Sequence, residues 1–335
     1  MPMKPYLIFV GDAAESAYTK TAQGVRQWAP DACVGQWRLT GSAIDLGLPD
    51  MAPAAAHAAG ARSMLMGIAP IGGLLPAAWI PMVIEALEAG LDIVAGLHSR
   101  LSSIPEIADA AARCGRSLHE VRQTTRSFPV ANGLKRSGKR LLTVGTDCAL
   151  GKKYTALAVA DAMRRQGVNA DFRATGQTGI MIAGDGVAID SVVADFIAGT
   201  AEVLSPDAAE DHWDVIEGQG AIFHPAYAGV TLGLLHGSQP DALILCHDPA
   251  RTHIAGFPEA PIRPLGETMD IYISLAHVTN PAAKFVAIAL NTSSLPEAEA
   301  LALAAELEAA HALPVFDPIR FGIDGAVTKI LAQGY

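Results

Sequence analysis

Short apolar runs alternate with helix-like segments through the first third of the chain. This alternation is typical of a parallel sheet with helices on its faces. The clearest helix follows Pro76, because apolar residues from Trp79 to Leu87 recur on one face, and Gly90 is expected to end it. Strands are predicted at residues 6–10, 33–37, 63–67 and 92–95. The pattern therefore predicts an α/β fold.

A turn-rich stretch over residues 124–138 interrupts this periodicity. A new apolar run begins at Leu141, so we predict two domains, residues 1–125 and 126–335. The second half then repeats the alternation of strands and helices. Its predicted strands are residues 141–144, 170–174, 213–216, 242–246 and 284–290, and its predicted helices are residues 152–166, 190–198, 266–277 and 296–311.

The strongest chemical signal lies between the strand at 141–144 and the helix at 152–166. The sequence there is Gly-Thr-Asp-Cys-Ala-Leu-Gly-Lys, residues 145–152. Glycines let a backbone curl around an anion, amide N–H groups and the helix N-terminus point at it, and the lysine adds a positive charge. We expect this loop to bind a cofactor phosphate, the alternative being a structural turn. The predicted cofactor-binding residues are Gly145, Thr146, Asp147, Cys148, Gly151, Lys152, Lys153 and Thr155.

The loop departs from the usual phosphate-binding motif at one position. Lys153 stands where a serine or threonine hydroxyl would bind Mg²⁺. A second cation in that place suits a phosphate held without a metal, so we expect no metal. Thr155 could supply the hydroxyl only if the helix began later. An ATP- and Mg²⁺-dependent ligase or kinase, with Asp147 and Glu217 near the metal, is the alternative.

Two further predicted strands end in polar segments, where open α/β sheets bind ligands. At the end of the strand at 170–174, Arg173 could bind a substrate carboxylate, and Gln177 and Thr178 could complete the contacts. The alternative is that Arg173 pairs with a local acid. After the strand at 213–216, Glu217 and His224 are candidate general bases.

Four other features carry weaker signals. Asp190 either caps a helix or serves as a third candidate base. Cys148 could accept an acyl group, although direct transfer is the preferred interpretation. The polar set at 247–253 could recognise a base or a second phosphate, and the turn at 67–73 is interpreted as tight packing between a strand and a helix.

The composition narrows the classes of function. The 335 residues carry a formal net charge of −10, whereas duplex binding needs clustered Lys and Arg. We interpret the one basic cluster, residues 135–140, as a solvated linker. No apolar stretch reaches about 18 residues, the start lacks the parts of a secretion signal, and the four cysteines form no C-x-x-C pair. We expect a cytoplasmic homo-oligomer with small-molecule substrates and neither nucleic-acid nor membrane partners.

The motifs together resemble a known family. The loop at 145–152 and the Glu-Gly-x-Gly sequence at 217–220 look like those of dethiobiotin synthetases, which are ATP-dependent ligases. A resemblance over nearly the whole chain is to the bacterial D-glutamate N-acetyltransferases. The segments that carry it are residues 71–76, 96–98, 145–152, 175–179, 217–220 and 224–227.

This second resemblance implies a Rossmann-like N-terminal domain and a P-loop NTPase-like C-terminal domain. It also implies transfer of the acetyl group of acetyl-CoA to the amine of D-glutamate, in D-amino-acid catabolism. Coenzyme A carries several phosphates, so a nucleotide-phosphate loop could bind it without phosphoryl transfer. A nucleotide-binding regulatory protein without catalysis is a third possibility, which the polar groups at three strand ends disfavour.

Overall fold

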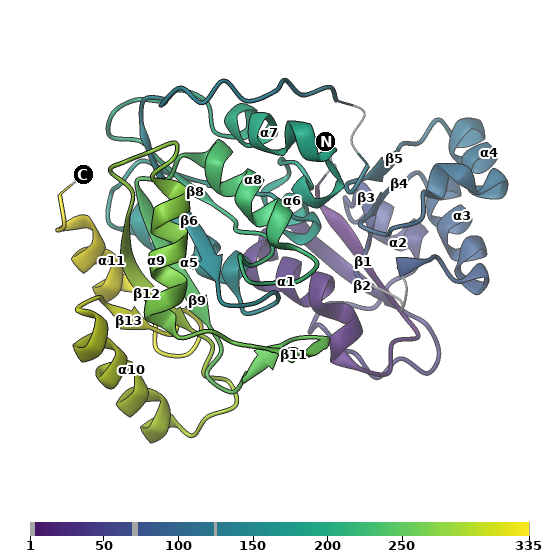
Figure 1. Cartoon of the computed structure of the whole chain (residues 1–335). Coiled ribbons are helices and arrows are strands. Elements are labelled where there is room, and N and C mark those ends of the chain that lie inside the picture. The colour runs from purple at the N-terminus through teal and green to yellow at the C-terminus, as the bar shows by residue number, and fades with distance from the viewer. Residues whose placement is uncertain (1–3, 69–72, 124–125, 335) are drawn as a thin grey trace. The chain divides into compact units, whose positions relative to one another are not determined.

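The computed structural model describes residues 4–68, 73–123 and 126–334. Contacts group the chain into two compact units. Unit 1 comprises Met1–Thr125 with Gly176–Ser191, and unit 2 comprises Arg126–Thr175 with Val192–Tyr335. Each unit contains its own parallel sheet (Figure 1). Residues 69–72 of the predicted turn at 67–73, and residues 124–125 next to the predicted domain boundary, lie outside the described residues.

Unit 1 has a five-stranded sheet in the order β2-β1-β3-β4-β5, with all neighbouring pairs parallel. All four strands predicted in this region are confirmed, within one residue at each end. The strands are β1 (Tyr6–Gly11), β2 (Cys33–Arg38), β3 (Ser63–Met66), β4 (Asp92–Ala95) and β5 (Leu118–Glu120). The helices are α1 (Lys20–Trp28), α2 (Pro53–Ala58), α3 (Ile80–Glu88), α4 (Pro105–Cys114) and α6 (Gln177–Ala183).

An aromatic group forms part of the core of unit 1. Phe9 of β1 packs edge-on against Trp37 and Trp79, with ring centroids 5.3 and 5.4 Å apart. The helix predicted after Pro76 is α3, and its apolar face is buried as expected. It ends at Glu88 with Ala89 as its C-cap, and Gly90 follows with φ near +92°, so the glycine ends the helix as predicted.

The segment Gly176–Ser191 belongs to unit 1 although the chain on both sides of it belongs to unit 2. It contains α6, which packs against α1. The Tyr6 hydroxyl donates to the Met181 carbonyl at 3.1 Å, and the hydroxyls of Thr21 and Thr178 lie 3.1 Å apart. These contacts join residues more than 150 positions apart, so no local pattern predicts them.

Unit 2 has a six-stranded parallel sheet in the order β13-β12-β9-β6-β8-β7. All five strands predicted here are confirmed. The strands are β6 (Lys139–Gly145), β7 (Ala170–Arg173), β8 (Trp213–Ile216), β9 (Ala242–His247), β12 (Lys284–Leu290) and β13 (Val315–Phe316). The helices are α5 (Lys152–Arg165), α7 (Ile197–Leu204), α8 (Ala228–Ser238), α9 (Leu265–Ala276), α10 (Glu297–His311) and α11 (Asp324–Leu331), and β10 (His253–Ile254) pairs with β11 (Phe257–Pro261) in an antiparallel hairpin.

The helix predicted at residues 190–198 is wrong. Two short 3₁₀ turns, Ile189–Ser191 and Ala194–Phe196, occupy this region, and α7 begins only at Ile197. Val193 lies between the turns with ψ near 136°, which is not a helical conformation. β-branched residues lose side-chain freedom in a helix, so the pair Val192-Val193 favours this interruption.

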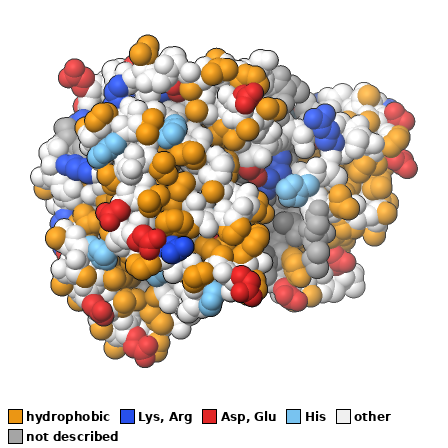
Figure 2. All heavy atoms as spheres, viewed as in Figure 1, with side chains coloured by type: hydrophobic (Ala, Val, Ile, Leu, Met, Phe, Trp, Pro, Cys, Tyr) orange, Lys and Arg blue, Asp and Glu red, His pale blue; other side chains and the backbone are white. Residues whose placement is uncertain are grey.

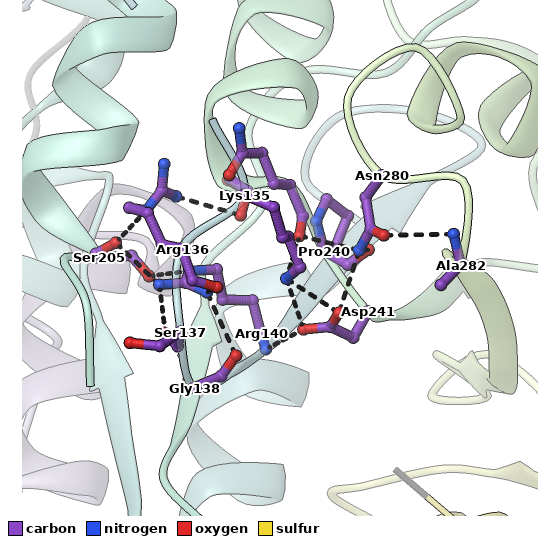
Figure 3. A network of polar contacts seen from close by, with 12 residues as sticks. Lys135, Arg136, Ser137, Gly138, Arg140, Ser205, Pro240, Asp241, Asn280 and Ala282 are labelled. Atoms are coloured by element: carbon purple, nitrogen blue, oxygen red, sulfur yellow. Dashed lines mark hydrogen bonds and ion pairs between the residues drawn. The ribbon is translucent and has the colours of Figure 1, made fainter. Parts of the chain in front are cut away.

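The interpretation of residues 135–140 as a solvated linker is also wrong. Arg140 is only 1% exposed and donates to the Ser205 hydroxyl and the Ser137 carbonyl (Figure 3). It also donates to the Pro206 carbonyl at 2.8 Å. Arg136 donates to the Ser205 carbonyl at 2.7 Å. The cluster therefore satisfies buried backbone carbonyls within unit 2, which is a structural role.

The surface shows a mixed charge pattern. On the face drawn in Figure 2, the Lys and Arg side chains of the described residues are scattered among acidic and hydrophobic ones and form no continuous basic surface. Within the described part of the chain, no helix combines the length and the apolar character needed to cross a membrane.

Candidate active site

The phosphate loop joins β6 to α5 in unit 2 and curls tightly. Gly151, directly before α5, has φ near +113°, and Ala149 has φ near +54°. A Cβ atom at Gly145 would lie 3.1 Å from the Asp147 carbonyl oxygen and 3.3 Å from Lys152 Nζ. The curl therefore brings the start of the loop close to the lysine at its end, as a phosphate cradle requires.

Lys152 lies inside this curl. Its side chain is only 6% exposed, and Nζ donates to the Asp147 carbonyl at 2.7 Å. Burial lowers the pKa of this ammonium group below that of an ordinary lysine. A bound phosphate would stabilise the charged form, so the position suits an anion.

Asp147 holds the loop from the other side. Its fully buried carboxylate accepts hydrogen bonds from Arg251 at 2.7 Å, from the Ala255 amide at 2.9 Å and from the Cys148 amide at 2.6 Å. Arg251 also donates to the Cys148 carbonyl at 2.7 Å. The carboxylate of Asp147 thus contacts protein groups, and the segment after β9 fixes the shape of the loop.

Arg251 is the residue that the sequence interpretation placed wrongly, as a contact for a base or second phosphate. Its guanidinium instead bonds three consecutive residues of the loop, since it also reaches the Ala149 carbonyl at 3.3 Å. The sequence did contain a sign of this contact, because Arg251 follows β9. β9 is the neighbour of β6, so the ends of the two strands lie at one edge of the sheet.

The other loop side chains also have protein contacts. The Thr146 hydroxyl lies 3.0 Å from His247 Nδ1, and the buried Thr155 hydroxyl accepts from the Cys246 thiol at 3.5 Å. Lys153 Nζ lies over the Tyr154 ring, 4.4 Å from its centre. Thr155 therefore faces the sheet interior instead of replacing the metal-binding hydroxyl absent at position 153.

Glu217 follows β8 and is 4% exposed. Its Oε2 accepts a hydrogen bond from the Thr175 amide at 3.0 Å. The next residue must be glycine, because a Cβ at Gly218 would lie 1.6 Å from the Thr143 carbonyl oxygen of β6. The same atom would lie 3.1 Å from Lys152 Cδ, so the turn after Glu217 packs directly against the lysine of the phosphate loop.

His224 lies on the other side of the loop, near Asp147. It is 2% exposed, Nδ1 accepts the Ala226 amide hydrogen at 3.1 Å, and Nε2 lies 3.9 Å from Asp147 Oδ1. An Nδ1 that accepts leaves the proton of the neutral ring on Nε2. Neither nitrogen then offers a lone pair to a substrate, and this geometry favours Glu217 over His224 as a base.

Residues 129–327 match the family model described as the P-loop domain of the domain of unknown function DUF1611, and residues 32–124 match its Rossmann-like domain. This chain belongs to the DUF1611 family. The match confirms the predicted fold class, a Rossmann-like N-terminal domain followed by a P-loop domain.

Proteins similar to this DUF1611 chain include two named D-glutamate N-acetyltransferase. One, from Tritonibacter scottomollicae, is 48% identical over 328 residues and covers 98% of both chains. Another, from Pseudoalteromonas sp., is 44% identical over 326 residues, 97% of this chain and 98% of its own. These relatives confirm the predicted family resemblance. A crystal structure of a DUF1611 family protein from Anabaena variabilis is 32% identical, covers 99% of this chain and all of its own, and has a TM-score of 0.86.

In this DUF1611 chain, Arg173 takes the alternative role considered from the sequence. Its Nε donates to Asp214 at 2.6 Å, and its NH2 group lies 3.4 Å from Asp171. His212 Nε2 lies 3.0 Å from the same Asp214 oxygen. Arg173 therefore pairs with local acids, and this geometry does not support its predicted role in binding a substrate carboxylate.

Three predicted site residues belong to unit 1 of this DUF1611 chain. Thr178 contacts Thr21, as described above, and Asp190 pairs with Arg122 instead of capping a helix. The buried Oε1 of Gln177 has no hydrogen-bond partner among the described residues. The structure thus brings together the phosphate loop, Glu217 and His224 in unit 2, whereas Asp190, Gln177 and Thr178 have their contacts in unit 1.

Among the residues that the structure describes, two groups of side chains are close enough to share a metal ion, but neither suits one. Asp147, Cys148 and His224 place their ligand atoms within 4.8 Å of one another. Arg251 already pairs with Asp147, and the proton of His224 lies on the nitrogen that faces it. In the second group, formed by Asp171, His212 and Asp214, the guanidinium of Arg173 already pairs with both carboxylates and takes the place of a metal cation.

Proposed function

We propose that this protein is a D-glutamate N-acetyltransferase that uses acetyl-CoA. The observation that carries the proposal is the phosphate loop, in which a buried lysine faces the curl while Asp147 is held by Arg251. Such a loop offers N–H donors and a cation but no ligand set for Mg²⁺. The two relatives named for this activity support the same assignment.

We place the phosphates of coenzyme A on the loop formed by residues 145–153. The residues fit this group, because the tight curl leaves amide N–H groups and the Lys152 ammonium as the charged and polar donors. Phosphate oxygens accept such charge-assisted hydrogen bonds without a metal. Lys153 would then contribute mainly its backbone amide, whereas the Cys148 amide already bonds the Asp147 carboxylate.

Glu217 is the proposed general base. Only a free amine attacks a thioester, so the ammonium of D-glutamate must first give a proton to a base. The amine nitrogen then bonds to the carbonyl carbon and the carbon–sulfur bond breaks. The thiolate of coenzyme A takes up the second proton that the nitrogen loses as it becomes an amide. Glu217 suits the first step because the Thr175 amide holds its carboxylate and the turn that follows it, at Gly218, packs against Lys152.

The test is an assay of free thiol released from acetyl-CoA, with D-glutamate, L-glutamate and D-aspartate as acceptors. We expect N-acetyl-D-glutamate as the product and a loss of turnover of roughly 10²-fold or more in Glu217→Gln, the usual size of a general-base contribution. Glu210→Gln is the matched control, because Glu210 is an exposed acid near the start of β8. If His224→Ala lost turnover and Glu217→Gln did not, the two roles would be exchanged.

The ligase alternative is tested with the same protein. Phosphate release from ATP and Mg²⁺, without a response to acetyl-CoA, would contradict the proposal. Because Lys153 replaces the metal-binding hydroxyl and Asp147 pairs with Arg251, we expect no such activity. A role in D-amino-acid catabolism, the cytoplasmic location and the homo-oligomeric state stay predictions.

A further inference from the structure

Unit 1 contains a cavity of about 310 Å³ that is open to solvent, at the amino-terminal edge of its sheet next to the starts of β3 and β4. Small-molecule sites are typically about 300–1,000 Å³, so this volume suits a small ligand. The residues that matter in its lining are His57, Arg62, Gly90, Asp92 and Arg116. The phosphate loop and Glu217 belong to unit 2, so the proposed catalytic residues do not account for this cavity.

The lining concentrates positive charge in a chain whose formal net charge is −10. Arg62 directly precedes β3, and Arg116 lies in the turn before β5. One N–H of Arg116 donates to the Gly90 carbonyl at 3.1 Å, which fixes the guanidinium at the cavity and uses one of its five donors. Two guanidinium groups are the side chains best suited to bind two carboxylates.

Gly90 and His57 form the part of the cavity next to Arg116. Gly90 has φ near +92°, and a Cβ there would lie 3.2 Å from His57 Cε1. A side chain at position 90 would thus be strained and would crowd the His57 ring. The missing side chain at position 90 therefore leaves room for the imidazole, and the carbonyl of the same residue binds the Arg116 guanidinium.

Asp92 supplies the single negative group. It is 8% exposed, Oδ1 accepts the Ser117 amide hydrogen at 2.9 Å, and Oδ2 lies 3.4 Å from His119 Nε2. A carboxylate has about four lone-pair sites, so these two contacts leave capacity for another donor. A nearly buried carboxylate with free acceptor capacity, in a lining that also holds two guanidinium groups, suits the ammonium of a zwitterion.

We propose that this cavity is a second binding site for a free acidic amino acid, whose two carboxylates contact Arg62 and Arg116 and whose ammonium contacts Asp92. The charges match, since such a ligand carries two negative groups and one positive group. The site rests on the proposed function only in the choice of D-glutamate as the first probe. Occupation of the cavity does not require acetyl-CoA.

The test is equilibrium dialysis of the full chain with labelled D-glutamate and L-glutamate in the absence of acetyl-CoA. Glutamate can bind in the cavity and at the proposed catalytic site. We expect Arg62→Glu and Arg116→Gln each to raise the Kd of the cavity site by roughly tenfold or more and to leave the other site unchanged, since each removes a charge-assisted contact in the cavity. Arg113→Gln is the matched control, because Arg113 also lies near the end of α4 but pairs with Glu88 on the surface. Thermal unfolding of each variant checks that Arg62→Glu, at an exposed position, leaves the fold intact.

Competition separates this proposal from simple anion binding. Inorganic phosphate and N-acetyl-D-glutamate, which lacks the ammonium, should compete poorly, and Asp92→Asn should remove the preference for the free amino acid. Equal binding of phosphate, or unchanged glutamate binding in Arg62→Glu, would overturn the proposal. If glutamate binding depends on Arg62 and Arg116 while no acetylation is detected, the cavity assignment stands and the proposed function fails.

Discussion

Replacing Arg251 with alanine should weaken both the fold of unit 2 and the binding of acetyl-CoA. The change removes the guanidinium that bonds Asp147, Cys148 and Ala149. Removing one partner of a buried ion pair typically costs about 3–5 kcal/mol. Arg251 is 26% exposed, and two backbone amides still bind the Asp147 carboxylate, so we expect a smaller loss of about 2 kcal/mol.

The effect on catalysis should appear mainly in KM. Without Arg251 the loop loses three contacts that hold its curl, so the binding-competent conformation becomes less populated and the apparent affinity falls in proportion. We expect KM for acetyl-CoA to rise by roughly tenfold, because about 1.4 kcal/mol corresponds to a factor of ten. The turnover number should change little, since Glu217 is held by Thr175 and not by Arg251.

The assay combines initial rates at saturating D-glutamate with chemical unfolding. Arg38→Ala is the matched control, because Arg38 is similarly exposed at 30% but pairs with the exposed carboxylate of Asp50. Exposed pairs typically contribute only about 0.2–1 kcal/mol. A double-mutant cycle with Asp147→Asn should give a coupling energy above about 1 kcal/mol for Arg251. Wild-type KM and stability in Arg251→Ala would refute the reasoning.

Three further outcomes follow from the same loop. Lys152→Ala should raise KM for acetyl-CoA, measured in the same assay, by roughly ten- to hundredfold, because it removes a charge-assisted phosphate contact. Phosphate binds the charged form of Lys152, and burial lowers the pKa of this group. KM for acetyl-CoA should therefore rise with pH already at pH values below the usual pKa of a lysine, and Lys152→Arg should not show this rise. Activity should survive EDTA, whereas loss with EDTA and rescue by Mg²⁺ would favour a ligase. Burial raises the pKa of Cys148 and thus disfavours a thiolate, so Cys148→Ala should stay active with intersecting initial-rate plots, and a trapped acetylated Cys148 would contradict this.

The strands were predictable because strands buried on both faces of a parallel sheet read as continuous apolar runs. The apolar run at residues 242–246, for instance, is β9 with one further residue, His247. The hairpin of β10 and β11 has no such signal, since Pro258 and Pro261 make its second strand read as a loop. The prediction of a helix at 190–198 was wrong because the spacing of apolar residues gives no information on the extended backbone at Val193.

The phosphate loop was predictable, but the directions of its side chains were not. A Gly-rich loop between strand and helix is a local pattern, and the structure has it at the expected residues. The partner of Asp147 lies 104 positions away in the sequence, and the partner of Arg173 lies 41 positions away. Only the strand order, which brings β9 beside β6 and β8 beside β7, determines these pairs.

These pairs bear on how a phosphate loop can work without a metal. The side-chain oxygens of Thr146, Asp147 and Thr155, in the loop and the start of α5, each contact a protein group of unit 2. A Mg²⁺ ion would have to compete with Arg251 for the Asp147 carboxylate, leaving a guanidinium without its partner, which is costly in a buried setting. A phosphate group meets no such competition, because the Lys152 ammonium donates to the backbone carbonyl of Asp147 and pairs with no carboxylate of the described residues. The arrangement thus favours anion binding over metal-assisted phosphoryl transfer, as the acetyl-CoA proposal requires.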